Sequence, residues 1–169
     1  MRNLLERLEK DVLVADGAMG TALYGNGLES CHEYNNISNP DSVEKIHKAY
    51  IEAGADIIQT NTYAAKKCQL KTYGYEDKFE EINIRAAEIA RKAAGKNTFV
   101  FGTIGAIRGL RECELSLETI VKETLDQAKV LLSTDKIDAL LFETYYDQEE
   151  IRAVLTEVRK LTDLPIITN

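Results

Sequence analysis

The chain has 169 residues, enough for one folded domain, and its 44% hydrophobic and 29% charged residues are ordinary for a soluble globular protein. The net charge is −7 and no segment concentrates lysine and arginine, which argues against the basic face that nucleic-acid binding requires. No apolar run approaches the roughly 20 residues of a membrane helix, and the charged N-terminus lacks the apolar stretch of a signal peptide, so we expect a cytoplasmic protein without a membrane partner.

Short apolar runs alternate with segments of helical spacing along the chain. Residues 3–10 predict a short helix before the first run. The runs have the length and apolar character of strands that are covered on both faces, as in a parallel sheet. The five predicted strands are residues 12–15, 56–60, 98–102, 139–142 and 165–168.

Four longer helices are predicted between these strands. Apolar residues recur at helical spacing over residues 43–53, 79–93, 117–132 and 151–158. Asn39 with Pro40 fits the start of the first long helix, and Gly54 fits its end. Asp147 with Glu150 resembles a capping box at the start of the last one.

This alternation predicts an α/β fold with a parallel sheet and right-handed crossovers. Two architectures fit: a complete open sheet of five strands, or the first part of an eight-stranded barrel. The chain ends one residue after its last predicted strand, and a (β/α)8 barrel needs about 250 residues. We therefore expect residues 1–169 to be the first five β/α units of a TIM-type (β/α)8 barrel, truncated after strand five, with no second domain.

Polar residues follow the predicted strands at their carboxyl ends, where ligands bind in parallel α/β folds. Asp16 and Gly17 follow the first strand, Asn61 and Thr62 the second, and Glu143 the fourth. Structural alternatives exist for the four polar residues, namely an Asx-type turn at Asp16, a loop cap at Asn61 and Thr62, and an ion pair at Glu143. Convergence of four polar side chains on one edge favours a ligand site.

Cysteine and histidine residues do not form a metal-binding pattern. The odd number and wide spacing of Cys31, Cys68 and Cys113 argue against a disulfide framework, and no pair has the spacing of a structural zinc site. We expect reduced thiols and no metal ligand in this chain. A metal site built from Cys31, His32 and Glu33 is the less favoured alternative.

The remaining charged residues are interpreted as structural. Lys66 and Lys67 are interpreted as part of a solvent-exposed face, and His47 as a surface or packing residue of its helix. Arg108 and Arg111 follow the third predicted strand. They are interpreted as solvated loop charges, with anion binding as the alternative.

Four motifs resemble, in the same order, those of the homocysteine-binding domain family. They are DGAMGT at 16–21, NISNP at 36–40, AGADIIQTNTY at 53–63 and FET at 142–144. The resemblance covers essentially the whole chain. It is strongest to the bacterial type that fuses this domain to a methylenetetrahydrofolate reductase, notably in GTIGAIR at 102–108, although relatives often have Gly-Pro where this chain has Gly105 and Ala106.

The resemblance implies a (β/α)8 barrel that transfers a methyl group from a methyl donor to homocysteine, giving methionine. The family's zinc, held by three cysteines after the sixth and eighth strands, keeps the homocysteine thiol as a nucleophilic thiolate. No cysteine of this chain matches those positions. Zinc is therefore expected for the full-length domain, FAD or folate for a following domain, and no catalytic residue for this fragment.

The resemblance also implies roles for the residues at the strand ends. Asp16 and Glu143 would contact the substrate ammonium, Gly17 would allow close backbone approach, and Thr62 with Asn61 would complete the polar rim. Two alternatives remain: a catalytically inactive partial-barrel binding or structural module, and an unrelated lyase or hydrolase barrel with Asp16 and Glu143 as acid and base. Open barrel edges would also allow association with another copy of the chain.

Overall fold

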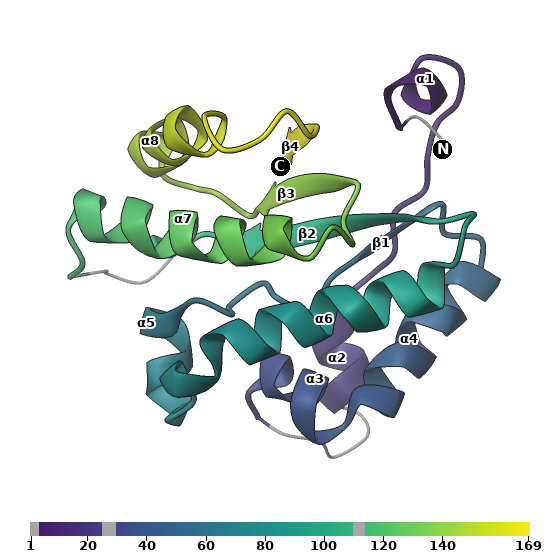
Figure 1. Ribbon diagram of the computed structural model, residues 1–169, viewed down its shortest axis with the longest axis horizontal. Helices are drawn as coiled ribbons and strands as arrows, with labels where there is room; N and C mark the ends of the chain where they lie inside the picture. Colours follow the sequence, from purple (N-terminus) through teal and green to yellow (C-terminus); the bar gives the residue numbers. More distant parts are fainter. Residues whose placement is uncertain (1–3, 25–29, 110–113) are drawn as a thin grey trace.

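A computed structural model describes residues 4–24, 30–109 and 114–169. Its centre is a parallel sheet of four strands in the order β1 (Ile57–Gln59), β2 (Phe99–Gly105), β3 (Ala139–Glu143) and β4 (Ile166–Thr168). Strands that are consecutive in sequence are neighbours in the sheet (Figure 1), and the register pairs Ile57 with Phe99, Phe101 with Ala139 and Leu140 with Ile166. The predicted α/β class with a parallel sheet is therefore confirmed.

The first predicted strand is corrected by the structure. Residues 12–15 form only an isolated parallel bridge, between Ala15 and Ile57. The backbone amide of Val14 donates to the Asp56 carboxylate (3.1 Å) rather than to a strand carbonyl. The Val12 side chain is 92% exposed, so little packing holds this segment in the sheet. The sheet thus has four strands and one bridge in place of five strands.

The four long helices lie where the apolar spacing predicts them. They are α4 (Pro40–Glu52), α6 (Phe79–Ala94), α7 (Leu117–Ser133) and α8 (Gln148–Val158). Shorter helical elements are α1 (Leu4–Leu8), α2 (Met19–Tyr24), η1 (His32–Tyr34), α3 (Asn35–Ser38), α5 (Lys67–Leu70), η2 (Lys71–Tyr73) and η3 (Glu76–Lys78). Gly54 and Gly95 follow α4 and α6 with φ of 107° and 57°, values at which a side chain would strain the backbone.

The start of α8 shows half of the predicted capping box. Asp147 accepts hydrogen bonds from the backbone amides of Glu149 (2.8 Å) and Glu150 (3.1 Å), as an N-cap residue does. Glu150 does not complete the box, because its carboxylate is fully buried and accepts from the amides of Ile107 (2.8 Å) and Arg108 (2.9 Å). It joins α8 to the loop after β2.

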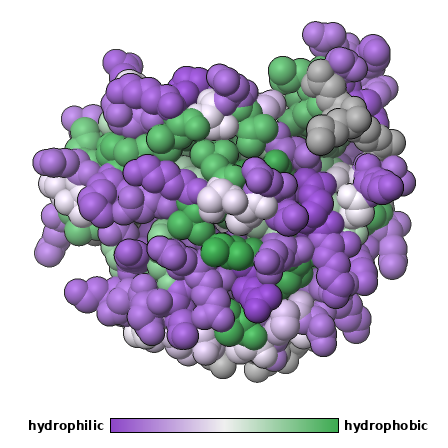
Figure 2. Space-filling model, viewed as in Figure 1, coloured by the Kyte–Doolittle hydropathy of each residue, from purple (hydrophilic) through white to green (hydrophobic). Residues whose placement is uncertain are grey.

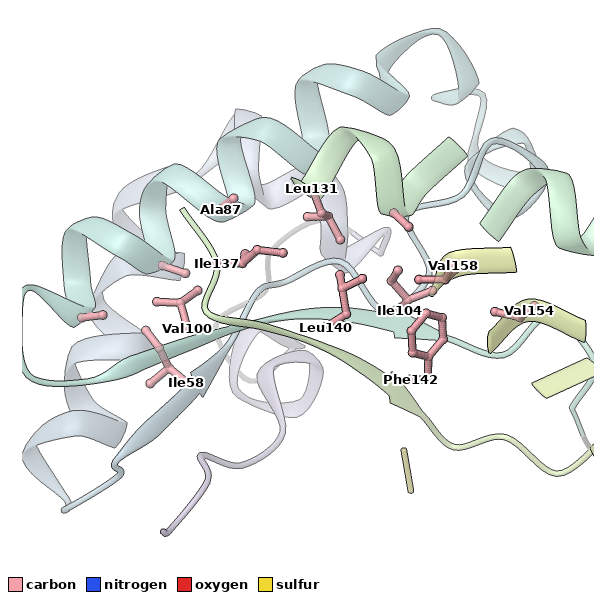
Figure 3. Close-up of a cluster of buried hydrophobic side chains, with 13 residues drawn as sticks. Ile58, Ala87, Val100, Ile104, Leu131, Ile137, Leu140, Phe142, Val154 and Val158 are labelled. Carbon is pink, nitrogen blue, oxygen red and sulfur yellow. The ribbon is translucent and has the colours of Figure 1, made fainter. Parts of the chain in front are cut away.

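Both faces of the sheet are apolar. Ile58, Val100 and Leu140 point toward the helices, where they pack with residues such as Leu131 of α7 and Val154 of α8 (Figure 3). The alternate positions of the strands form a second cluster on the other face, with Leu4 of α1 against it; its strand members are Ile57, Phe99, Phe101, Ala139 and Leu141. This alternation follows from the two-residue period of a strand.

The outer surface is mostly hydrophilic in the view of Figure 2, with hydrophobic residues interspersed among charged ones. Within the described ranges, no helix is long and apolar enough to cross a membrane.

Candidate ligand-binding site

The carboxyl ends of the strands surround a cavity of about 420 Å3. All five residues predicted for the site line it: Asp16, Gly17, Asn61, Thr62 and Glu143. They come from the segment before α2, the loop after β1 and the end of β3, so the predicted convergence is found. A larger cavity of about 840 Å3 lies at the opposite edge of the sheet, against α1, away from these residues.

Asp16 is held in the cavity wall by Gln59, the last residue of β1. Its carboxylate accepts hydrogen bonds from the Gln59 backbone amide (3.0 Å) and side-chain amide (3.1 Å). Burial nevertheless raises the pKa of Asp16 from 3.8 to about 6, and repulsion from Glu143 adds to the increase. The hydrogen bonds from Gln59 oppose both effects, because they stabilise the charged form.

Glu143 enters the cavity from a strained turn. It is the last residue of β3 and is half-buried, and this burial raises the pKa of its carboxyl group. The next residue, Thr144, has a φ of 61°, which is unfavourable for a β-branched side chain. The Thr144 amide donates to the Asn169 side chain (2.9 Å), a contact that helps to hold this turn. Strain of this kind is often found at functional sites.

Asn61 and Thr62 have their side chains engaged within the protein. The Asn61 amide donates to the His32 carbonyl (2.8 Å) and to the Asn36 side chain (3.0 Å). The Thr62 hydroxyl is fully buried and bonds to the Thr60 hydroxyl (2.6 Å) and the Thr103 carbonyl (2.7 Å). These bonds fix the loop after β1, while direct contact of Asn61 or Thr62 with a ligand stays a prediction.

Gly17 allows a close approach, and the structure shows what approaches it. A Cβ atom at this position would lie 3.0 Å from the Tyr50 hydroxyl and 3.1 Å from the Tyr50 ring. Tyr50, on α4, also donates a hydrogen bond to the Ala18 carbonyl (3.0 Å). Within the part of the chain that the structure describes, the backbone amides of Gly17 and Ala18 have no hydrogen-bond partner.

The cavity lining also includes residues that were not predicted for this site, among them Gln59, Thr103, His32 and Tyr63. The Thr103 hydroxyl donates to the Gln59 side chain (3.2 Å), which extends the Asp16 network to β2. Gln59 and Thr103 are polar residues within otherwise apolar strands. That interruption is the feature of the sequence by which they could have been found.

The described residues do not fit a zinc site. Among them, no three His, Cys, Asp or Glu side chains are grouped so that they could hold a metal ion. Burial raises the pKa of both Cys31 and Cys68 to about 11, so that both are neutral thiols at pH 7. Cys113 and Arg111 lie outside the described residues.

Two interpretations of charged residues need correction. Lys66 is fully buried, so the solvated-face interpretation of the Lys66-Lys67 pair is wrong for Lys66, although Lys67 is exposed. His47 is also fully buried, which confirms packing over a surface position. Burial lowers the pKa of His47 to about 4. Arg108 is paired with Asp147 (3.0 Å), rather than being a free loop charge.

A parallel α/β layer with polar residues gathered at the carboxyl edge of its strands defines a class, the α/β proteins that bind small ligands at this edge. Residues 13–169 match the family model described as homocysteine S-methyltransferase, and the chain belongs to that family.

Known proteins similar to the chain agree with this assignment. The chain is 33% identical to the methionine synthase of Mycobacterium leprae and 30% identical to that of Mycobacterium tuberculosis, each over 172 aligned residues. These alignments cover 94% of the chain but only 14% of each methionine synthase. The chain therefore corresponds to a small part of those proteins.

Solved structures with a similar fold include two of the homocysteine methyltransferase MmuM from Escherichia coli. The metallated form has a TM-score of 0.83 at 24% identity, and the oxidized form 0.80 at 25% identity. The superpositions cover 98% of this chain and 65% and 64% of the MmuM chains. The four-stranded α/β fold of this chain is thus similar to part of the fold of a TIM-barrel homologue.

Proposed function

We propose that this chain forms the amino-acid-binding part of a homocysteine S-methyltransferase domain, with the homocysteine ammonium between Asp16 and Glu143. The observation that carries the proposal is the pair of partly buried carboxylates facing one cavity. Both have raised pKa values, and no described lysine or arginine lines the cavity to balance them. A ligand that supplies a cation would relieve this repulsion.

The rest of the amino acid has candidate partners in the same cavity. The free amides of Gly17 and Ala18 are suitable donors for the substrate carboxylate. Asn61 and Thr62 would bound the cavity on the β1 side, in positions fixed by their internal hydrogen bonds. The family membership of the chain supports homocysteine over other amino acids.

Zinc activation of the thiol is part of the proposal only for the complete domain. The described residues of this chain do not fit the metal, so its ligands would come from elsewhere in the domain. We expect the chain alone to bind no stoichiometric zinc and to transfer no methyl group. A cytoplasmic location, a following folate- or FAD-binding domain and self-association through sheet edges are further proposals.

Calorimetric titration with L-homocysteine tests the binding site. Asp16→Asn and Glu143→Gln each keep the side-chain shape and remove one charge. Each should weaken binding about 10- to 100-fold, because a hydrogen bond to a charged group is worth about 1.5–3 kcal/mol. Asp163→Asn, at an exposed loop position, is the matched control and should bind as the wild type does.

Ligand variants test the ammonium contact separately. N-acetylhomocysteine lacks the positive charge and should bind the wild type much more weakly than homocysteine does. This preference for homocysteine should be smaller in Asp16→Asn, where only Glu143 remains to contact the ammonium. If homocysteine fails to bind while the protein acts on a carbonyl or phosphate substrate, Asp16 and Glu143 belong instead to an acid–base pair of a lyase or hydrolase. If neither occurs, the chain is a structural module.

A further inference from the structure

Lys66 is a fully buried lysine behind the candidate site. Its ammonium donates a hydrogen bond to the carbonyl of Gly105, the last residue of β2. Lys66 does not line the cavity, so the proposed function gives it no part in ligand contact. Burying a charged amine is costly unless it is paired, and burial lowers the pKa of Lys66 to about 8. Such a cost calls for a physical explanation.

The loops that hold the cavity meet around Lys66. Glu33, Glu123 and Glu150 interact electrostatically with its ammonium. These carboxylates also accept backbone amides: Glu33 from Ala64 (2.8 Å) and Glu123 from the Cys68 amide (3.0 Å). Glu150 holds the loop after β2 in the same way. Lys66 thus lies among carboxylates that hold the loops after β1 and β2, and its positive charge is favourable for each of them.

Gly105 links this buried cluster to the cavity wall. Its amide donates to the Tyr63 carbonyl (2.9 Å), and its carbonyl accepts from both Lys66 and the Tyr145 hydroxyl (3.4 Å). A Cβ atom on Gly105 would lie 2.6–2.7 Å from the Tyr63 ring, closer than such contacts occur. The ring therefore rests directly on the Gly105 backbone, and moving that backbone must move the ring.

Tyr63 is the residue through which this contact reaches the ligand. Its side chain lines the cavity, and its phenol lies by Thr144. Burial raises the pKa of this phenol, and the nearby charge of Glu143 adds to the increase. The position of the ring therefore defines the side of the cavity where Glu143 would meet the ammonium.

We propose that Lys66 is a positioning residue for ligand binding: it holds the Gly105 carbonyl so that the Tyr63 ring forms the cavity wall beside Glu143. The inference rests on the proposed homocysteine-binding function for its effect on affinity. Its structural part, the dependence of the Tyr63 ring on Lys66, is independent of which ligand binds.

A double-mutant cycle distinguishes positioning from general stability. Lys66→Met keeps an unbranched side chain one atom shorter than lysine and removes the ammonium. It should lower homocysteine affinity about tenfold, as small misplacements in a site do. In a Tyr63→Ala background the same substitution should have no further effect, because the ring that it positions is absent. Lys71→Met, at an exposed position five residues later, is the matched control and should leave the affinity unchanged.

Tyrosine NMR reports on the ring without a ligand. In protein labelled with 13C-tyrosine, with the Tyr63 signal assigned through Tyr63→Phe, Lys66→Met should shift the Tyr63 ring resonances and Lys71→Met should not. If Lys66→Met does not fold, Lys66→Leu also removes the ammonium and should likewise shift the Tyr63 ring resonances.

The two proposals fail in different ways. Failure of the wild type to bind homocysteine refutes the proposed function. In that case the positioning role of Lys66 is tested only by whether Lys66→Met shifts the Tyr63 ring resonances. If the wild type binds and Lys66→Met binds equally well, or if Lys66→Met weakens binding as much in the Tyr63→Ala background as in the wild type, the positioning role of Lys66 is refuted. An unshifted Tyr63 signal refutes it as well.

Discussion

Replacing Asp16 by asparagine should stabilise the protein at alkaline pH while it removes a charge needed for binding. Burial raises the pKa of Asp16 from 3.8 to about 6, so the folded state holds this proton more tightly than the unfolded state. Below pH 3.8 both states are protonated and the group has no effect. As the pH rises from 3.8 to 6, the folded state becomes progressively less stable relative to the unfolded state, and above pH 6 the full penalty applies.

The size of this penalty follows from the two pKa values. The difference between 3.8 and about 6 corresponds to about 3 kcal/mol, at 1.36 kcal/mol for each tenfold change in proton affinity. Asparagine removes only part of this penalty. Its side-chain NH2 group would face the NH2 group of Gln59, and two donors cannot bond to each other unless the Gln59 amide flips. We therefore expect Asp16→Asn to raise the free energy of unfolding by about 1–2 kcal/mol at pH 8.

Urea denaturation followed by circular dichroism measures the difference at pH 8 and at pH 4. The stabilisation of Asp16→Asn relative to wild type should shrink as the pH falls, whereas Asp163→Asn should show little change. Saturating homocysteine should reverse the order at pH 8, since the wild type binds it 10- to 100-fold more tightly and therefore gains more binding free energy than Asp16→Asn. A variant that is less stable than wild type at pH 8 without ligand would refute the argument from burial.

Three further predictions concern other residues. His47→Leu should raise the free energy of unfolding by about 1 kcal/mol at pH 7, since both ring nitrogens are buried without a described partner. Because the pKa of His47 is lowered from 6.5 to about 4, the wild type should lose stability as the pH falls from 6.5 toward 4, and His47→Leu should lose less in urea titrations. Thr144→Gly should relieve about 1 kcal/mol of backbone strain and raise the melting temperature. The same substitution loosens the turn that presents Glu143, so calorimetry should show weaker homocysteine binding. Treatment with a zinc chelator should leave the melting temperature of this chain unchanged, because its described residues offer no metal site; a fall would contradict this.

Features set by local sequence were predictable. The positions of the long helices follow from apolar spacing, and Asp147 and Gly54 mark helix ends through interactions within a few residues. The carboxyl end of β3 was predictable as well, because an apolar run stops where Glu143 begins the polar segment, whereas β2 continues three residues past its predicted end, to Gly105. The edge on which Asp16 and Glu143 meet then follows from the parallel topology alone.

Features set by distant contacts were not predictable from local patterns. Lys66 next to Lys67 looks like a solvated pair, yet its partner is a carbonyl 39 residues away. Residues 12–15 have the composition of a strand, but only one of them forms a bridge to β1. Glu150 fits a capping box by spacing, and only the packing of α8 against the loop after β2 gives its carboxylate other donors.

The internal hydrogen bonds of Asn61 and Thr62 have a kinetic consequence. Because these side chains are already satisfied, a ligand entering the cavity would meet walls that need little rearrangement and little additional ordering. Association rates should then be similar for homocysteine and its close analogues. Selection among these amino acids should appear in how long each complex lasts before it dissociates.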